Sequence, residues 1–249
     1  MDKIHLIMPM GGGGTRFGNK GFNVPKPLIM LRDKPFFYWA AECILQNVEV
    51  EDITFVVLRE HIEKFSIDSK IKSFYPDAKI VVIPEVLKGA VLTCLEGVKT
   101  INDNLPLLFE DCDHAFLSKA FFDYANLGEF KAPDAALLTF KSDNPAYSYA
   151  RFDDNGRVIG TIEKQVVSNE AICGAYYFKS AALFEEASAN YLKACAYNEF
   201  FVSGVYNELI KLGREVSTFA IDEHISFGTP DEYDESISDE RLGELIKCR

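Results

Sequence analysis

Residues 4–16 read IHLIMPMGGGGTR, an apolar run that ends in four consecutive glycines. The run Ile4–Met10 has the length and composition of a buried strand. A row of glycines costs conformational entropy on folding, so it indicates that the backbone comes close to another group. The N–H groups of such a loop can converge on a phosphate oxygen, and the guanidinium of Arg16 suits the same anion. We therefore predict a strand that delivers an anion-binding loop, whose residues are Gly11, Gly12, Gly13, Gly14 and Thr15.

This loop matches neither of two common phosphate-binding motifs. No Gly-Lys-Ser/Thr follows at the spacing of a P-loop, and the third glycine of GxGxxG would fall on Arg16 or Phe17. An exposed turn without function is the alternative interpretation. Arg16 directly follows the loop, where its guanidinium could bind a phosphate, and this position favours the interpretation as an anion-binding loop.

Lys26 follows, between Pro25 and Pro27. The two proline rings restrict the backbone, and we expect them to hold Lys26 in an extended segment. A rigidly presented ammonium suits phosphate neutralisation in group transfer. A solvated lysine in a proline turn is the alternative, and the neighbouring glycine loop favours the functional interpretation.

Strand and helix patterns alternate through the first half of the chain. Apolar, β-branched runs predict strands at 53–58, 79–83 and 105–109, and helical spacing predicts helices at 35–46 and from Gly89 onward. This rhythm is typical of an α/β fold with a mostly parallel sheet that helices cover on both faces.

The second half adds a hairpin, in which the segments 147–152 and 157–163 flank Asp154-Asn155-Gly156. Further strands are expected at 135–141, 171–178 and 215–221, and helices at 181–194, 199–212 and 230–247. We expect one domain over residues 1–249, with a nucleotide-binding half at 1–115 and an acceptor-binding half with the hairpin at 116–249.

The composition excludes several classes of protein. A net charge of −12 argues against a nucleic-acid partner, which needs a basic surface. The apolar start of the chain is too short for a signal peptide or a membrane span, so we expect no membrane association. The six cysteines form no CxxC pair and indicate neither a disulfide framework nor a zinc site, as in a cytoplasmic protein with reduced thiols.

A cluster of acidic residues, Glu110-Asp111-Cys112-Asp113, follows directly after the expected strand at 105–109. The ends of strands form the edge of an open α/β sheet where ligands collect. Carboxylates at this edge can bind Mg²⁺, which prefers oxygen ligands. An acidic helix cap before Ser118 is the alternative.

Five motifs occur in the order seen in sugar-1-phosphate nucleotidylyltransferases, and the whole chain resembles the short bacterial members related to glucose-1-phosphate thymidylyltransferase. These motifs are Gly11 to Arg16, Pro25-Lys26-Pro27-Leu28, Asp111-Cys112-Asp113-His114, Glu163-Lys164 and Phe227-Gly228-Thr229-Pro230. The resemblance implies a Rossmann-like sheet, dependence on Mg²⁺ and release of pyrophosphate.

The resemblance also implies roles for single residues. Arg16 matches the arginine that grips the triphosphate, and Lys26 matches the lysine that neutralises the attacking phosphate. Gly89 begins a segment similar to the one that lines the nucleobase. Asp113 matches the aspartate that holds Mg²⁺.

On the acceptor side, Glu163 and Lys164 resemble the pair that contacts the sugar and its phosphate. Gly174 resembles a glycine of the sugar pocket. Asp111 stands where Asn is usual, and His114 stands where Gln is common.

One position departs from the family pattern. Ser226 stands where the family often carries a second metal-binding aspartate, and the nearest upstream carboxylates are Asp222 and Glu223. Asp111 or water could complete the metal shell instead.

These observations predict a Mg²⁺-dependent nucleotidyltransferase that joins a nucleoside triphosphate to a sugar 1-phosphate, or a similar small phosphorylated acceptor, for nucleotide-sugar or surface-polysaccharide precursors. One alternative is a regulatory protein that binds nucleotides without turnover. Another is a glycosyltransferase that uses a nucleotide sugar, since Asp111 and Asp113 have the spacing of its metal motif. A homo-oligomer is left open, with Phe121-Phe122 and Phe200-Phe201 as candidate interface aromatics, although core packing is favoured for both pairs.

Overall fold

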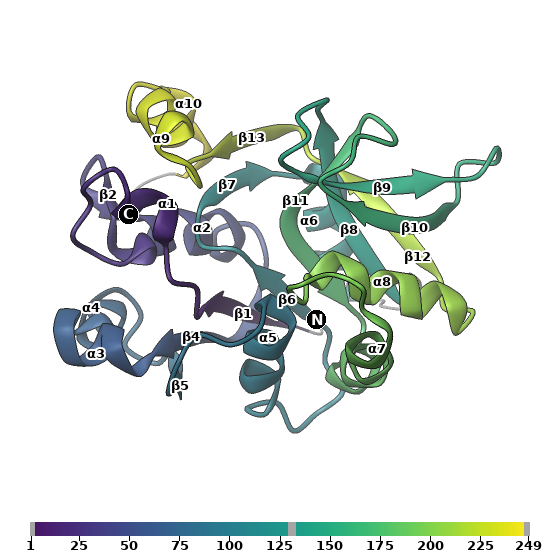
Figure 1. Ribbon diagram of the computed structural model, residues 1–249, viewed down its shortest axis with the longest axis horizontal. Coiled ribbons are helices and arrows are strands. Elements are labelled where there is room, and N and C mark those ends of the chain that lie inside the picture. The colour runs from purple at the N-terminus through teal and green to yellow at the C-terminus, as the bar shows by residue number, and fades with distance from the viewer. Residues whose placement is uncertain (1–2, 129–132, 247–249) are drawn as a thin grey trace.

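The computed structural model describes residues 3–128 and 133–246, and one large mixed sheet runs through it (Figure 1). The sheet has nine strands, in the order β10-β9-β11-β6-β1-β4-β5, with β8 paired to β11 and β12 paired to β8. The strands are β1 (Ile4–Met10), β4 (Val50–Leu58), β5 (Lys79–Ile83), β6 (Leu107–Glu110), β8 (Ala135–Lys141), β9 (Ser148–Phe152), β10 (Val158–Glu163), β11 (Glu170–Phe178) and β12 (Val216–Ala220). This arrangement confirms the expected α/β class.

The pairing of the strands changes from parallel to antiparallel at β11. Strands β6, β1, β4 and β5 are parallel, as the alternating pattern of the first half predicts. Strand β11 pairs antiparallel with β6, β8 and β9, and the predicted hairpin forms between β9 and β10. The carboxyl ends of β1 and β6 therefore meet the antiparallel half at one edge.

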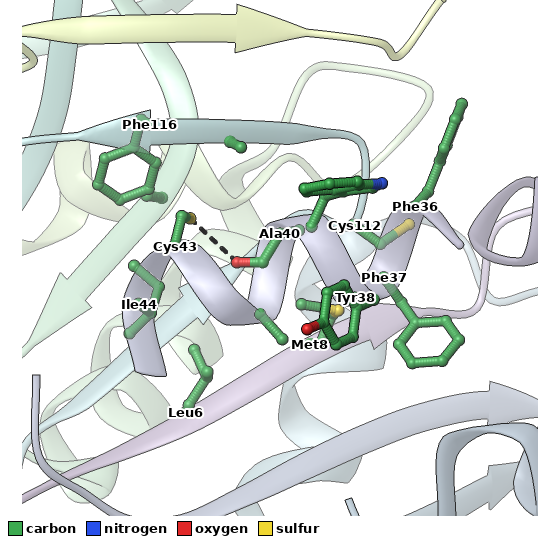
Figure 2. Packing of buried hydrophobic residues seen from close by; sticks show 14 of the residues in the cluster. Leu6, Met8, Phe36, Phe37, Tyr38, Ala40, Cys43, Ile44, Cys112 and Phe116 are labelled. Carbon is green, nitrogen blue, oxygen red and sulfur yellow. Dashed lines mark hydrogen bonds between the residues drawn. The ribbon is translucent and has the colours of Figure 1, made fainter. Parts of the chain in front are cut away.

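Helices cover both faces because apolar side chains alternate along the strands. In β1, Leu6 and Met8 belong to one buried cluster and Ile7 to another. The first cluster packs against α2 (Phe36–Leu45) and α6 (Lys119–Leu127), and the second against α5 (Ala90–Val98), α7 (Ala181–Ala194) and α8 (Val202–Lys211). Figure 2 shows Leu6 and Met8 beside α2.

The C-terminal part of the described chain packs against its N-terminal part. Strand β13 (Glu223–Ser226) pairs antiparallel with β7 (His114–Leu117), and α9 (Pro230–Ile237) follows it. Tyr233 of α9 packs edge-on against Phe17 and Phe22, and its hydroxyl donates to the carbonyl oxygen of Met30 at 3.1 Å. In Figure 1, α9 lies next to α1 (Thr15–Gly18), and α10 (Arg241–Leu245) follows α9.

The predicted closing helix at 230–247 is wrong, because the described part forms two helices, α9 and α10. Asp239 separates them, and its side chain accepts a hydrogen bond from the backbone N–H of Arg241 at 3.1 Å. Such local bonds from Asp compete with a continuous helix. Lys247 and Cys248 lie outside the described residues.

Three other predicted boundaries are wrong. Strand β6 begins at Leu107 rather than at residue 105. Helix α8 begins at Val202 rather than at residue 199, because the backbone N–H of Phe200 donates to the carbonyl oxygen of Lys88 at 3.0 Å. Strand β4 begins at Val50 rather than at residue 53 and keeps its pairing with β1. The elements that the pattern did not predict are β2 (Met30–Leu31), β3 (Lys34–Pro35), α1, α3 (Arg59–Phe65), α4 (Ile67–Phe74), α6, β7 and β13.

The five cysteines in the described ranges are free thiols, as expected. Phe121 and Phe122 are buried in the first cluster, so core packing is confirmed for that pair. No helix among the described residues is long and apolar enough to cross a bilayer.

Candidate active site

The glycine loop leaves the end of β1 in a fixed conformation. A Cβ on Gly11 would lie 2.6 Å from Cδ1 of Ile83 and 3.1 Å from the side chain of Thr93, so a larger residue there would displace these side chains. Gly14 has φ of 60°, in the left-handed region, where it begins the short helix α1. The backbone of the loop is thus held close to β5 and α5.

A cavity of about 210 Å³ opens beside this loop. Gly11, Gly12 and Gly13 line it, and so does Gly89. Gly14 and Thr15 are not among the lining residues and form the turn into α1. The sequence motif therefore brings three of its five loop residues to this first cavity.

The segment around Gly89 is tied to a distant part of the chain. Phe200 accepts a hydrogen bond from the backbone N–H of Val91 at 3.1 Å, and the ammonium of Lys88 lies 4.8 Å from the centre of the Phe200 ring. Glu199, the residue before Phe200, lines the first cavity and also a second one. One wall of the first cavity is thus built by the second half of the chain.

Lys26 lies where the two cavities meet and lines both. It begins a 3-10 helix, Lys26–Leu28, so the predicted extended segment is wrong. Pro27 fits the first turn of a helix because that turn needs no N–H from it. The ammonium of Lys26 lies 2.7 Å from Oδ2 of Asp113. Burial lowers the pKa of Lys26, but the Asp113 carboxylate outweighs it and raises the pKa above its usual value.

The acidic residues after β6 lie at the same junction. Burial and the neighbouring charge of Asp113 raise the pKa of Asp111 to about 7. Burial also raises the pKa of Asp113, but Lys26 lowers it more, so this carboxyl ends below its usual value. A helix cap is not their role, because Ser118 caps α6 by accepting from the N–H of Phe121 at 3.4 Å.

Two glycines make room for these carboxylates. A Cβ on Gly174 would lie 2.8 Å from Oδ2 of Asp111, and one on Gly228 would lie 2.4 Å from Oδ2 of Asp113. Gly174 also has φ of 95°, which disfavours other residues. The glycine predicted from the family resemblance thus borders both the second cavity and Asp111.

The second cavity, of about 380 Å³, collects most of the other predicted residues. Arg16, Asp113, Glu163, Lys164 and Gly174 line it. Arg16 lines this cavity and not the first, although the family resemblance implies a role at the triphosphate.

Glu163 is held by two hydroxyl groups from different elements. Ser148 of β9 donates to its Oε1 at 2.6 Å, and Ser203 of α8 donates to the same oxygen. Lys164, the next residue, has φ of 54° and places its ammonium 5.6 Å from the centre of the Phe201 ring.

Ser226 also lines the second cavity. Glu232, which was not predicted as a site residue, lines it too. Tyr147 donates its hydroxyl to Oε1 of Glu232 at 2.8 Å. Glu232 is in the first turn of α9, where its backbone N–H donates to the Thr229 side chain at 3.3 Å. Asp222, one of the two upstream candidates, accepts instead from the backbone N–H of Lys119 at 2.7 Å. A signal for Glu232 existed, since Thr-x-x-Glu marks the start of a helix.

The carboxylate oxygens near the meeting point of the two cavities provide part of the ligand set that Mg²⁺ needs. Asp111 and Asp113 offer the hard oxygen atoms that Mg²⁺ prefers, and their crowding favours a cation between them. Within residues 3–128 and 133–246, no group of three or more His, Cys, Asp and Glu side chains is placed to hold a metal ion. A Mg²⁺ here would take its other ligands from water and from phosphates, as this ion commonly does.

The model of a protein family described as nucleotidyl transferase matches residues 5–238. No curated protein sequence matches the chain.

Three solved structures are similar to this chain. A nucleoside-diphosphate-sugar pyrophosphorylase from Vibrio cholerae RC9 superposes with a TM-score of 0.79 at 20% identity, over 93% of this chain and 99% of its own. An inositol-1-phosphate CTP transferase from T. maritima gives 0.77 at 15% identity, over 100% and 99%. A protein assigned as a glucose-1-phosphate thymidylyltransferase from Bacillus anthracis gives 0.75 at 17% identity, over 94% of each chain. At these identities the likeness shows the fold.

Proposed function

We propose, from the premise that this chain belongs to the nucleotidyl transferase family, that it joins a nucleoside triphosphate to a small phosphorylated acceptor and releases pyrophosphate. A sugar 1-phosphate is the acceptor class we favour, in the synthesis of nucleotide sugars or surface-polysaccharide precursors. Such reactions use triphosphates of the cytoplasm, where we propose that the protein acts.

The proposal rests on one observation: the two cavities meet at the ammonium group of Lys26. Lys26 and Asp111 line both cavities, and the ammonium of Lys26 is the positive group at their shared wall. Transfer of a nucleotidyl group needs two phosphates brought together with their charges neutralised. A protein that only binds a nucleotide needs one cavity and no cation between two.

In the proposed reaction, an oxygen of the acceptor phosphate attacks the α-phosphorus of the triphosphate in line. The bond from that phosphorus to the bridging oxygen breaks, and pyrophosphate leaves with the electron pair. We assign the triphosphate to the first cavity, between the glycine loop and Gly89, and the acceptor to the second. Lys26 neutralises charge on both phosphates, and the guanidinium of Arg16 adds positive charge in the lining of the second cavity.

Asp113 is the residue we propose as the main metal ligand, with Asp111 beside it. A bound Mg²⁺ supplies neutralisation of the charge that develops on the phosphates. Gly228 and Gly174 keep space open for the two carboxylates. The division into a nucleotide-binding half at 1–115 and an acceptor-binding half at 116–249 then holds only in part, because Glu199 lines the first cavity and Arg16, Lys26 and Asp113 line the second.

The test is pyrophosphate release over a matrix of UTP, CTP, ATP and dTTP against several phosphorylated acceptors, with Mg²⁺ and with EDTA. We expect release with at least one pair, only in the presence of both substrates and Mg²⁺. Nucleotide binding with no release for any pair would favour the regulatory alternative. Release of a nucleoside diphosphate from a nucleotide sugar would favour the glycosyltransferase.

A further inference from the structure

The turn between β2 and β3 contains an arginine where the backbone favours glycine. The two strands pair antiparallel and leave Arg32 and Asp33 between them as a two-residue turn. Arg32 has φ of 55°, in the left-handed region. Glycine adopts positive φ at the first position of such a turn without strain, whereas a larger residue there costs free energy. The side chain of Arg32 makes contacts that offset this cost.

The Arg32 side chain holds the C-terminal end of α9. Its Nε donates to the carbonyl oxygen of Ile237, the last residue of α9, at 3.2 Å, and its Nη2 donates to the carbonyl oxygen of Asp239. The last carbonyl groups of a helix have no partner within the helix, and they form the negative end of its dipole. A guanidinium presents several donors in one plane, so one side chain can bind two carbonyl groups at this helix end. Arg32 thus caps α9 from a distant part of the chain.

The other end of α9 lies against Asp113. Gly228 precedes the first residue of α9 by two positions, and a Cβ on it would lie 2.4 Å from Oδ2 of Asp113. The backbone N–H of Phe227 donates to the carbonyl oxygen of Asp113 at 2.9 Å. Helix α9 has eight residues, so its two ends are about 12 Å apart. A short helix moves as a rigid element, and a shift of its capped end therefore reaches the backbone around Asp113.

These contacts form a closed circuit through the candidate active site. Lys26 begins the 3-10 helix Lys26–Leu28, which leads directly to β2 and so to Arg32. From Arg32 the circuit follows α9 back to Gly228 and Asp113. It closes where Oδ2 of Asp113 lies 2.7 Å from the ammonium of Lys26. The two ends of the circuit are thus the two charged groups to which the proposed reaction assigns phosphate and metal.

Helix α9 has a second attachment that does not depend on Arg32. The hydroxyl of Tyr233 donates to the carbonyl oxygen of Met30 at 3.1 Å, and its ring packs against Phe17 and Phe22. This attachment lies in the middle of the helix, between its two ends. Without the Arg32 side chain, α9 therefore stays docked but can tilt.

We infer that Arg32 is a positioning residue for the pair Lys26 and Asp113, and that it acts through α9. Arg32 lines neither cavity, so it touches neither substrate in the proposed complex. Small misplacements of reacting groups by distant changes lower the rate of a transfer reaction. The effect on turnover rests on the proposed function, whereas the effect on the backbone at Phe227 does not.

The first experiment measures amide hydrogen exchange in the full chain and needs no substrate. We expect the N–H of Phe227 to exchange about tenfold faster in Arg32→Ala and in Arg32→Gly than in the wild type, because its bond to Asp113 opens more often. Arg32→Lys keeps a cation and should restore part of the protection. Unchanged exchange at Phe227 in both variants would overturn the inference.

The second experiment compares turnover with melting temperature. Arg32→Gly relieves the backbone strain and Arg32→Ala does not, so the glycine variant should melt at the higher temperature. We expect kcat to fall about tenfold in both alike, and the KM for the triphosphate to stay within about threefold, because no residue of α9 lines the first cavity. A loss of kcat that follows the melting temperature would make the role of Arg32 purely structural and overturn the inference. If the wild type releases no pyrophosphate, the proposed function is rejected and the exchange rates alone decide the inference.

Ser66 supplies the matched control. It is exposed, has φ of 51°, and lines neither cavity. Ser66→Gly relieves the same kind of strain without removing a bond to α9, so exchange at Phe227 and kcat should stay within about twofold of the wild type. A change as large as that in Arg32→Gly would assign the effect to the glycine rather than to the lost guanidinium, and would overturn the inference.

Discussion

Gly89 and Phe200 are in contact through their backbones. A Cβ on Gly89 would lie 2.3 Å from the backbone nitrogen of Phe200 and 2.6 Å from its carbonyl oxygen. Gly89 lines the first cavity, while Phe201, just after Phe200, lines the second. The contact therefore joins the walls of the two cavities.

Gly89→Ala should separate those walls. The new methyl group clashes with backbone, and φ of 120° strains any residue but glycine. We expect KM to rise at least tenfold for both substrates, and the melting temperature to fall by several degrees. Pyrophosphate kinetics and thermal unfolding measure the two effects. Gly213→Ala is the control, because Gly213 also has positive φ but no atom within 4 Å of the Cβ position.

Arg16→Ala and Lys26→Ala should each lower turnover by about two orders of magnitude, since each removes a cation that stabilises phosphate charge. Arg16 is exposed and Lys26 only partly buried, so both variants should remain folded, as circular dichroism would check. Lys20→Ala, a change of an exposed lysine that lines neither cavity, serves as control. Near-normal pyrophosphate release from both variants would refute the assignment.

Asp113→Asn should raise the Mg²⁺ concentration needed for half-maximal rate by about tenfold or more, because it removes a charged oxygen ligand. A Mn²⁺ titration followed by electron paramagnetic resonance reports the same loss without turnover. Asp222→Asn should leave the Mg²⁺ dependence unchanged, because that carboxylate binds the backbone of Lys119. Equal Mg²⁺ requirements in the wild type and Asp113→Asn would exclude Asp113 as a ligand.

His5 predicts a dependence of stability on pH at the other end of β1. Its Nδ1 lies 3.0 Å from Asp52 and its Nε2 3.0 Å from Asp103. Burial lowers the pKa of His5, but the two carboxylates outweigh it, so the folded pKa is above the unfolded value of 6.5. The stabilisation is therefore complete below pH 6.5 and is lost as the pH rises through the folded pKa.

The carboxylates set the lower limit of this pH window. Burial raises the pKa of Asp52 and of Asp103, but hydrogen bonding to His5 lowers both below 3.8, so their contribution is lost only as the pH falls below that value. Urea unfolding should thus show the largest difference in unfolding free energy between wild type and His5→Gln at pH 4–6.5 and a smaller one at pH 8. His61→Gln should show the opposite trend as the pH rises toward 6.5, because burial lowers the pKa of His61 below that unfolded value. A difference for His5→Gln that does not change with pH would contradict the pairing.

Long periodic segments were predictable from the sequence. The bounds of β1, β5, β8 and α7 agree with the prediction because each is an apolar or amphipathic run of sufficient length. Strands β7 and β13 were not predictable, since each has four residues and exists through pairing between Ser226 and His114 or their neighbours. Local patterns carry no information about a partner more than 100 residues away.

The residues of the candidate site likewise include some that the sequence predicted and some that it did not. Motifs led to Lys26, Asp113 and Glu163, and the structure brings all three to the second cavity. Glu232 and Tyr147 were missed because their contact depends on how α9 packs against the segment before β9. The motif from Thr229 to Glu232 marks the start of α9, but it does not indicate a contact with a residue 85 positions away.

The aromatic group that unites Phe17, Phe22 and Phe36 with Phe227 and Tyr233 has a consequence for biosynthesis. On the ribosome, the first three rings emerge about 190 residues before the last two, a delay of at least ten seconds at ordinary elongation rates. During that interval the rings of the early segment lack the partners that cover them in the finished fold. The N-terminal part thus exposes apolar rings on the nascent chain, and it acquires its native packing only after Phe227 and Tyr233 have emerged.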